Sequence, residues 1–349
     1  MSEPAFQRNG SADSDKKLEA EQIEVGPSPS YAKPTLGTKV KRHCARWWWA
    51  HLIFFCISFL IIALCLVYVA MPKIAQHGVD ETTLEFTDIE FTEPTSNSVV
   101  LTQAAILHSP SMYTPHLDPF DASLFLVTNG VYGDSPMITV PVPGIHARHP
   151  RSNVSLAPTN ATFVSLDQVT AYATAVLTQE NVTTALVGRT KLHEGALPVV
   201  KVNYNSSSTY QGLNGLKGFN VTGARVDLTA KAGQPNLSGF AYIPNLSVLT
   251  IVMGNVTLSL ATERGIVGNT TINNMTIRPG NNTLPLTGTL DQSLVTASLN
   301  KTGWVTMQIT GQSCIYNGQH LTYYEKALSA NKLSLDLNVL QILTESTSS

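Results

Sequence analysis

Hydrophobic and polar positions divide the chain into a short head, an apolar run and a long body. The run, residues 47–71, reads WWWAHLIFFCISFLIIALCLVYVAM and carries no formal charge over 25 residues. At about 1.5 Å per residue it makes a helix of roughly 37 Å, enough to cross a hydrocarbon core of about 30 Å. The run predicts a transmembrane helix. A cleaved signal peptide is the alternative, and a buried core helix is disfavoured because the run lacks a polar stripe.

In the body, apolar and polar residues alternate with period two, as half-buried antiparallel strands require. The alternation is clearest between residues 219 and 260, where Gly254 and Asn255 predict a turn between two strands. Further short strands are predicted at 99–106, 123–127, 182–187, 199–204, 305–310 and 333–343. Many short strands separated by turns predict a mainly β sandwich or barrel. A minor helix is predicted at 321–330, either packed on the sandwich or forming a lid over an apolar cleft.

The body also repeats itself. NVSLAPTNAT at 153–162 returns as NMTIRPGNNT at 274–283, an offset of 121 residues. Self-similarity at this spacing predicts two tandem β-sandwich domains of a common domain size. The predicted organisation is a disordered tail at 1–46, the transmembrane helix at 47–71, a first sandwich at 72–205 and a second at 206–345.

Charge predicts the orientation of the helix. Four basic residues precede the apolar run, whereas only Lys73 follows it before an acidic stretch at 80–93; the four are Lys39, Lys41, Arg42 and Arg46. Because basic flanks stay on the cytoplasmic side, the tail is predicted to be cytosolic and the body lumenal, the type II signal-anchor topology.

Glycosylation acceptors agree with this orientation. The body carries twelve N-x-S/T sequons, at Asn153, Asn160, Asn181, Asn205, Asn220, Asn236, Asn245, Asn255, Asn269, Asn274, Asn281 and Asn300. Its 277 residues from Lys73 onwards hold only 14 Lys and Arg and 18 Asp and Glu, a net charge of −4. Glycans would supply the solubility that so few charges do not, so the body is predicted to be a glycoprotein.

The four cysteines predict no disulfide framework, because three lie in or beside the apolar run and Cys314 is alone in the body. Cys44, beside basic residues, is a candidate for palmitoylation, and an unmodified thiol is the alternative. Cys314 is interpreted as a small buried apolar residue, with an intermolecular disulfide as the alternative.

The sequence resembles a known family. GRTKLHEGALPVVKVNYNSSSTYQGLNGLKGFNVTG from Gly188, FAYIPNLSVLTIVMGNVTLSL from Phe240 and MTIRPGNN from Met275 resemble fungal membrane proteins related to late-embryogenesis-abundant type-2 (LEA-2-like) domains. The resemblance implies fibronectin-like sandwiches behind one N-terminal helix, placement in the vacuolar or another endomembrane, and no catalytic residues. This chain departs from the family at Asn245-Leu246-Ser247, where the family has Asn-Pro-Ser, and the departure creates a usable sequon.

Residues for catalysis, a cofactor or a metal ion are not predicted. The best metal candidates are His108, His116, His146, His149 and His193 with Asp118 and Asp121, but their spacing matches no helix-borne H-x-x-x-H arrangement. The glycines at 212–218 have the wrong spacing for a phosphate-binding loop, and no G-x-S-x-G elbow occurs.

Three functions remain in order of preference. The first is a non-enzymatic interaction module that contacts an unidentified protein partner. The second is a lumenal lipid binder tethered to the bilayer, suggested by low charge and long apolar strands. An anchored hydrolase or transferase is disfavoured, and no nucleic acid partner is expected.

Overall fold

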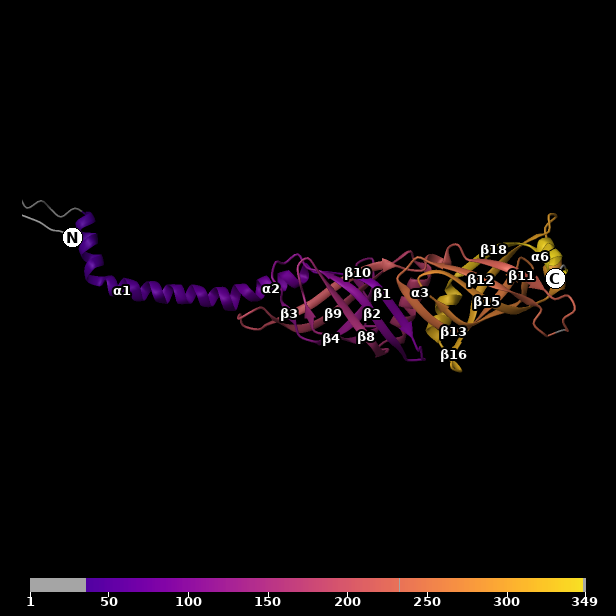
Figure 1. The fold of residues 1–349 in the computed structure, drawn as a ribbon, viewed down its shortest axis with the longest axis horizontal. Coiled ribbons are helices and arrows are strands. Elements are labelled where there is room, and N and C mark those ends of the chain that lie inside the picture. Colours follow the sequence, from indigo (N-terminus) through magenta and orange to yellow (C-terminus); the bar gives the residue numbers. More distant parts are fainter. Residues whose placement is uncertain (1–35, 232, 348–349) are drawn as a thin grey trace, which may run out of the picture. The chain divides into compact units, whose positions relative to one another are not determined.

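The computed structural model describes residues 36–231 and 233–347 (Figure 1). They fall into two compact units, residues up to Ile61 and residues 62–349. Most of the predicted disordered tail, residues 1–35, lies outside the described residues.

The apolar run is helical, and the helical stretch extends beyond the predicted transmembrane segment at both ends. Helix α1 spans Leu36–Cys65, a π-helical turn spans Leu66–Ala70, and α2 spans Met71–Asp80. Residues 36–46 are therefore helical rather than disordered, in keeping with the Lys, Arg and Ala they contain, which are good helix formers. The predicted start at Trp47 coincides with a break in α1, because this residue has non-helical backbone angles (φ −116°, ψ 19°).

The change of helix type before α2 has a local cause. Pro72 stands in the first turn of α2. Proline has no N–H group to donate to the carbonyl four residues earlier, so the regular ladder cannot pass through it. A π-helical turn is one way in which a helix accommodates such a missing bond.

The body is mainly β, as predicted, and consists of two open sheets with minor helices. The first sheet contains β1 (Thr83–Thr92), β2 (Ser98–His108), β8 (Arg151–Thr162), β11 (Asn220–Val226), β12 (Leu237–Asn245), β13 (Leu249–Thr262), β14 (Gly265–Ile277), β15 (Gly280–Leu290), β16 (Trp304–Tyr316), β17 (Gln319–His320) and β18 (Lys332–Asn338). The second contains β3 (His116–Leu117), β4 (Phe120–Thr128), β5 (Val131–Tyr132), β6 (Ile138–Val142), β7 (Ile145–His146), β9 (Asn181–His193) and β10 (Val200–Gln211).

The main path of the first sheet runs β11-β12-β15-β14-β13-β1-β2-β8, with β16 also paired to β13. Its strands come from both predicted sandwich domains. They meet where β1 pairs with β13 in parallel, Ile89 opposite Leu249. The predicted border at residues 205 and 206 lies inside β10, and the division of the body into two domains stays a prediction.

Two predictions within the strands are wrong. Gly254 and Asn255 do not turn the chain, since β13 continues through them as one strand of 14 residues. Gly254 instead occupies an irregular position with φ +81°, where an added Cβ would lie 2.4 Å from the Ile315 carbonyl oxygen. The predicted last strand at 333–343 ends early, because β18 gives way to helix α6 at Val339–Thr347.

Helices fill the middle of the body. The predicted helix at 321–330 is confirmed as α5 (Thr322–Ala330). Helix α3 (Leu166–Thr178) was not predicted, although Ser165 and Gln168 stand at the spacing of a capping box and the Ser165 hydroxyl accepts a hydrogen bond from the Gln168 N–H. Short η2 (Asn214–Leu216) and α4 (Gln292–Ala297) complete the helices of the described body.

Candidate functional site

An apolar cavity of the body lies beside α2 and reaches side chains that are exposed at the surface. This α2 cavity has a volume of about 170 Å³, and most of its lining residues come from α2, from β2 and the loop after it, from strands of the second sheet and from the loop after β9. Ala75, Gly78 and Val79 form the helical wall, and Leu107, Leu192 and Tyr204 form the wall of strands. The cavity therefore lies against the helix that continues from the apolar run.

Helix α2 is fixed to the body by a pair of hydrogen bonds that imitate the addition of a strand. The Gln76 side chain donates to the Asn203 carbonyl at 2.7 Å and accepts from the Asn203 N–H at 2.8 Å. Ala75 and Val79 are buried on the same side of the helix, while Thr82 donates to the Val79 carbonyl just after its last turn. One wall of the α2 cavity is thus held in place by both polar and apolar contacts.

Among the residues that line the α2 cavity, Tyr204 and Glu194 carry polar groups that bear on what it could bind. Tyr204 lies on the wall of strands, where burial raises the pKa of its hydroxyl and the ring packs 5.6 Å from Phe120. Glu194 contributes an oxygen, Oε2, that is shielded from solvent and has no hydrogen-bond partner within the described residues. A shielded carboxylate oxygen without a donor is costly, so a ligand with a donor at its polar end would suit this wall.

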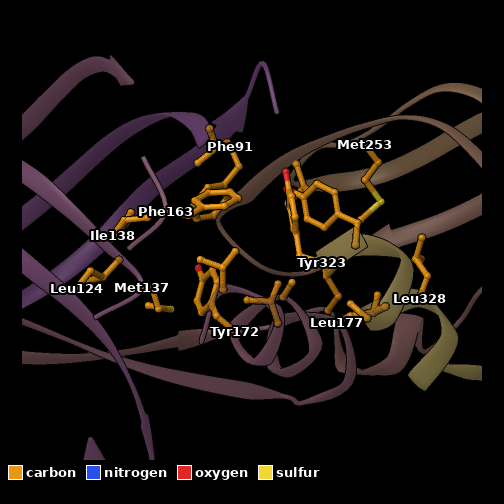
Figure 2. A pocket seen from close by; sticks show the side chains of 18 residues that line it. Phe91, Leu124, Met137, Ile138, Phe163, Tyr172, Leu177, Met253, Tyr323 and Leu328 are labelled. Atoms are coloured by element: carbon orange, nitrogen blue, oxygen red, sulfur yellow. The ribbon is translucent and has the colours of Figure 1, made fainter. Parts of the chain in front are cut away.

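A second apolar cavity lies in the middle of the body between α3 and α5. Figure 2 shows Phe163 and Tyr172 on one side of this central cavity and Met253 and Tyr323 on the other. Its volume is only about 50 Å³, and its labelled lining residues other than Phe163 are buried. Phe163 and Tyr323 meet edge to face at 5.2 Å.

The tyrosines around the central cavity are electrostatically unusual. Tyr172 and Tyr210 share a hydrogen bond of 2.8 Å. Burial raises the pKa of Tyr210 to about 12 and raises the pKa of Tyr172 well above its ordinary value. The Tyr323 hydroxyl is buried without a partner in the described structure, and burial raises its pKa as well. These hydroxyls stay protonated at any physiological pH, so they supply structure rather than acid–base chemistry.

Three of the predicted metal candidates lie side by side. His116 on β3 is in register with His146 on β7 and with His193 on β9, with ring centroids 4.7 and 6.2 Å away. Asp118 Oδ1 lies 3.1 Å from His193 Nε2 and 3.9 Å from His116 Nε2. Nevertheless, no group of three or more His, Cys, Asp or Glu side chains in the described residues is arranged to hold a metal ion.

The remaining candidates point elsewhere. His108 Nε2 lies 2.8 Å from Glu85, and the His149 ring bonds the Ser109 carbonyl at 3.1 Å. Asp121 belongs to β4, where it is in register with Pro141 of β6. The cluster of histidines and Asp118 therefore contains only part of the candidate set.

The structure separates the predicted glycan acceptors into accessible and inaccessible ones. Ten are exposed: Asn153, Asn160, Asn181, Asn205, Asn220, Asn255, Asn269, Asn274, Asn281 and Asn300. Asn236 is half-buried, and its amide exchanges two hydrogen bonds with the Leu290 backbone, of 2.8 and 2.7 Å.

Asn245 is the clear exception, because it is only 1% exposed. Its Nδ2 donates to the Leu249 carbonyl at 2.8 Å, and its Oδ1 accepts from the Ser247 N–H and hydroxyl. A glycan on this nitrogen would disrupt the folded turn, and glycosylation at the Asn245 sequon stays a prediction. The neighbouring Leu246 takes the exposed position at 84%.

The cysteines form no disulfide among the described side chains. Cys56 and Cys65 are exposed on the helix, whereas Cys314 is fully buried and donates to the Met253 carbonyl at 3.1 Å. Burial, with the nearby charge of Glu325, raises the pKa of the Cys314 thiol to about 12. The side chain of Cys44, the candidate for palmitoylation, lies outside the described residues.

Within the described residues, one helical stretch is long and apolar enough to cross a membrane. It covers Arg46–Asp80, 35 residues, and no part of its most apolar segment is buried in the protein. Together with the open β sheets, this defines the class as a β-rich protein with one candidate membrane span.

Comparison with known proteins adds an uncharacterised family. Residues 135–260 match the family described as "Protein of unknown function (DUF3712)". The match begins just before β6 and ends within β13, so it crosses the predicted border at residues 205 and 206. No curated protein matches the chain.

Proposed function

We propose that this is a non-enzymatic, single-pass type II endomembrane glycoprotein whose lumenal body binds part of a lipid acyl chain in the α2 cavity. Its basic flank and sequons support the orientation. Resemblance to the LEA-2-like proteins favours the vacuolar membrane. The observation that carries the binding role is the position of an apolar cavity of about 170 Å³ against α2, which is the end of the candidate membrane span.

The size of the α2 cavity limits what it holds. A dry cavity of about 150 Å³ accepts a molecule the size of benzene, and this one measures about 170 Å³. It therefore takes a short stretch of an acyl chain rather than a whole lipid. Glu194 at the wall favours a lipid with a hydroxyl or amine donor at its polar end.

Gly78 offers a direct way to close the cavity. It lines the cavity on α2, and a Cβ placed there would meet no atom within 4 Å. Gly78→Leu adds a branched apolar side chain at a position that lines the cavity, whereas Gly78→Ala adds one methyl group and leaves most of the cavity open. The two substitutions form a matched pair at one position.

The test is lipid extraction and mass spectrometry on the purified full chain, exchanged extensively into synthetic detergent. We expect a natural lipid to remain at close to one per protein in the original chain and in Gly78→Ala, and to be lost in Gly78→Leu. Equal lipid content in all three, or no retained lipid in the original chain, would overturn the binding role.

Topology has its own test. Endoglycosidase treatment is expected to increase the mobility of the protein on a gel, and protease added to intact vesicles is expected to remove the N-terminal tail while sparing the body. A body that is digested from the outside, or a protein without glycans, would contradict the proposed orientation.

An interaction module is the second candidate, favoured by one observation. Strand β8, 12 residues long, ends the main path of the first sheet and pairs there only with β2. Such an edge offers backbone groups to a strand from a partner protein. Substituting Ser155, which is exposed on β8, with lysine would place a charge on this edge and disfavour added pairing. Unchanged co-purification of partner proteins would remove the support for this candidate.

A further inference from the structure

One helix and two loops that border the α2 cavity expose apolar side chains. Ile74 on α2 is 57% exposed, Met112 and Tyr113 after β2 are 85% and 63% exposed, and Leu197 and Val199 before β10 are 40% and 51% exposed. We call these five residues the apolar rim. Each lines the α2 cavity or belongs to the α2, 109–115 or 194–199 segments that do so.

The segment 109–115, SPSMYTP, carries no charge and has a proline near each end. Met112 and Tyr113 are adjacent exposed apolar side chains on this loop, and exposed apolar side chains that gather on one surface mark protein or membrane interaction sites. Tyrosine has an apolar ring and a polar hydroxyl, and for that reason is enriched where a bilayer meets water.

The hairpin of β9 and β10 provides a second, independent observation, a pair of exposed lysines that face each other. Lys191 and Lys201 are directly opposite each other in its register, and both are exposed. Like charges opposite each other destabilise a strand pair, and neither lysine forms an ion pair in the described residues. Their flexible stems can reach an anion placed beyond the loop that joins the strands.

Other charges near the hairpin do not neutralise this pair. Asp118 lies close to His193 and His116, and Glu194 has one oxygen turned into the α2 cavity wall. A tip with Leu197 and Val199, flanked by two lysines, has the pattern of a segment whose apolar end enters a bilayer while its cations meet phosphates.

We infer that the apolar rim docks on the bilayer that the protein's own helix crosses, with Lys191 and Lys201 against lipid phosphates. The occupant is a lipid surface rather than a protein, because residues 62–80 run from the apolar run directly into the rim within one compact unit. Residues 72–152 also contain no sequon, so no predicted glycan stands on α2 or the 109–115 loop. The docking does not require that the α2 cavity holds a lipid.

The test places a fluorophore on the rim of the full chain in vesicles of phosphatidylcholine and phosphatidylserine. Met112→Cys is labelled with an environment-sensitive dye after Cys44, Cys56 and Cys65 are replaced with alanine; Cys314 is buried and does not compete. Leu246→Cys is the matched control, since Leu246 is 84% exposed and Met112 is 85% exposed. Leu246 lies at the turn between β12 and β13, outside the segments that line the α2 cavity.

Brominated lipids are expected to quench most of the emission at position 112 and little of it at 246. Lys191→Gln with Lys201→Gln should lower the quenching at 112 several-fold in vesicles with phosphatidylserine. Equal quenching at 112 and 246 would overturn the inference. Strong quenching at 112 that ignores both lysines would overturn the assignment of the phosphate contacts. Both readings are independent of whether lipid is retained in the α2 cavity.

Discussion

The α2 cavity and the central cavity are both apolar, but they differ in access and in the state of their walls. The central cavity is the smaller, about 50 Å³ against about 170 Å³, and it is enclosed by the buried aromatic rings of Figure 2. The α2 cavity is bordered by side chains that are half or more exposed, including Ile74 and Tyr113. The central cavity is a packing gap in the core, and the α2 cavity opens towards the surface.

Because both cavities have apolar walls but only one is bordered by exposed side chains, an apolar lining does not identify a binding site by itself. Around the central cavity, α3 and α5 and the strands of both sheets bury large side chains against one another, so its residues act in stability. Around the α2 cavity, the same kind of side chain is held near water beside a candidate membrane span. Substitutions at the two places should therefore separate folding from ligand binding.

The largest expected effect is on the central cavity. Leu328 on α5 is 5% exposed and lines it, so Leu328→Ala should lower the free energy of unfolding by about 2–5 kcal/mol. Leu197→Ala, the same truncation at the α2 cavity, should cost less than about 0.5 kcal/mol because Leu197 is 40% exposed. Urea unfolding followed by tyrosine fluorescence would compare them. Similar losses would erase the distinction between the cavities.

The next largest expected effect is a loss of folding stability at alkaline pH. The pKa values of Cys314 and Tyr210 are raised by burial to about 12 each, above their ordinary values of about 8.5 and 10. Between the ordinary and the raised pKa the folded state keeps the proton while the unfolded state loses it, so stability is complete below about pH 8.5 and falls as pH rises towards 12.

Cys314→Ala should remove the part of this loss that begins near pH 9 and leave the part from the tyrosines. Unfolding curves measured from pH 7 to 11 would show it. A Cys314→Ala profile identical to the original would mean that the buried thiol does not contribute.

A smaller effect is expected at the tyrosine pair. Tyr210→Phe leaves the buried Tyr172 hydroxyl without its 2.8 Å partner and should cost about 1–3 kcal/mol. Tyr323→Phe is the control, because the Tyr323 hydroxyl is buried and has no hydrogen-bond partner among the described residues, so its removal should be neutral or stabilising. Equilibrium unfolding of both variants tests this prediction. An equal loss of unfolding free energy in the two variants would contradict a stabilising role for the hydrogen bond between Tyr172 and Tyr210.

The smallest expected effect is on the stability of the body when Gly78 on α2 is replaced. Gly78→Ala should raise the stability of the body by about 0.5–1 kcal/mol, since alanine favours a helix interior and its methyl group meets no atom within 4 Å. Thermal unfolding would detect the rise. A fall in stability would mean that the space beside Gly78 is filled in the folded protein.

Parts of the fold follow from the sequence for simple reasons. Alternation predicts strands such as β2, β4 and β16 because side chains on a half-buried sheet repeat every second residue. The apolar run predicts a helix but not its ends. Hydropathy reports where charge resumes, whereas α2 continues to Asp80 because Gln76 and Val79 contact the body.

Other features depend on contacts that no local pattern contains. Gly254 resembles a turn signal, yet the pairing of β13 with both β14 and β16 carries the strand through it. The walls of the α2 cavity come from segments as far apart as Met71 and Tyr204, so the cavity exists only after folding. By contrast, Ser165 and Gln168 gave a local signal for α3 that alternation obscured.

Photocrosslinking with a lipid that carries a diazirine on its acyl chain tests the proposed binding role most directly. Crosslinked peptides from the full chain in vesicles would be mapped by mass spectrometry. If the α2 cavity binds an acyl chain, crosslinks are expected on peptides that contain Leu192 and Tyr204, which line the cavity. These crosslinks should be lost in Gly78→Leu but not in Gly78→Ala. Crosslinks confined to the apolar run at residues 47–71, with none on the body, would contradict the binding role.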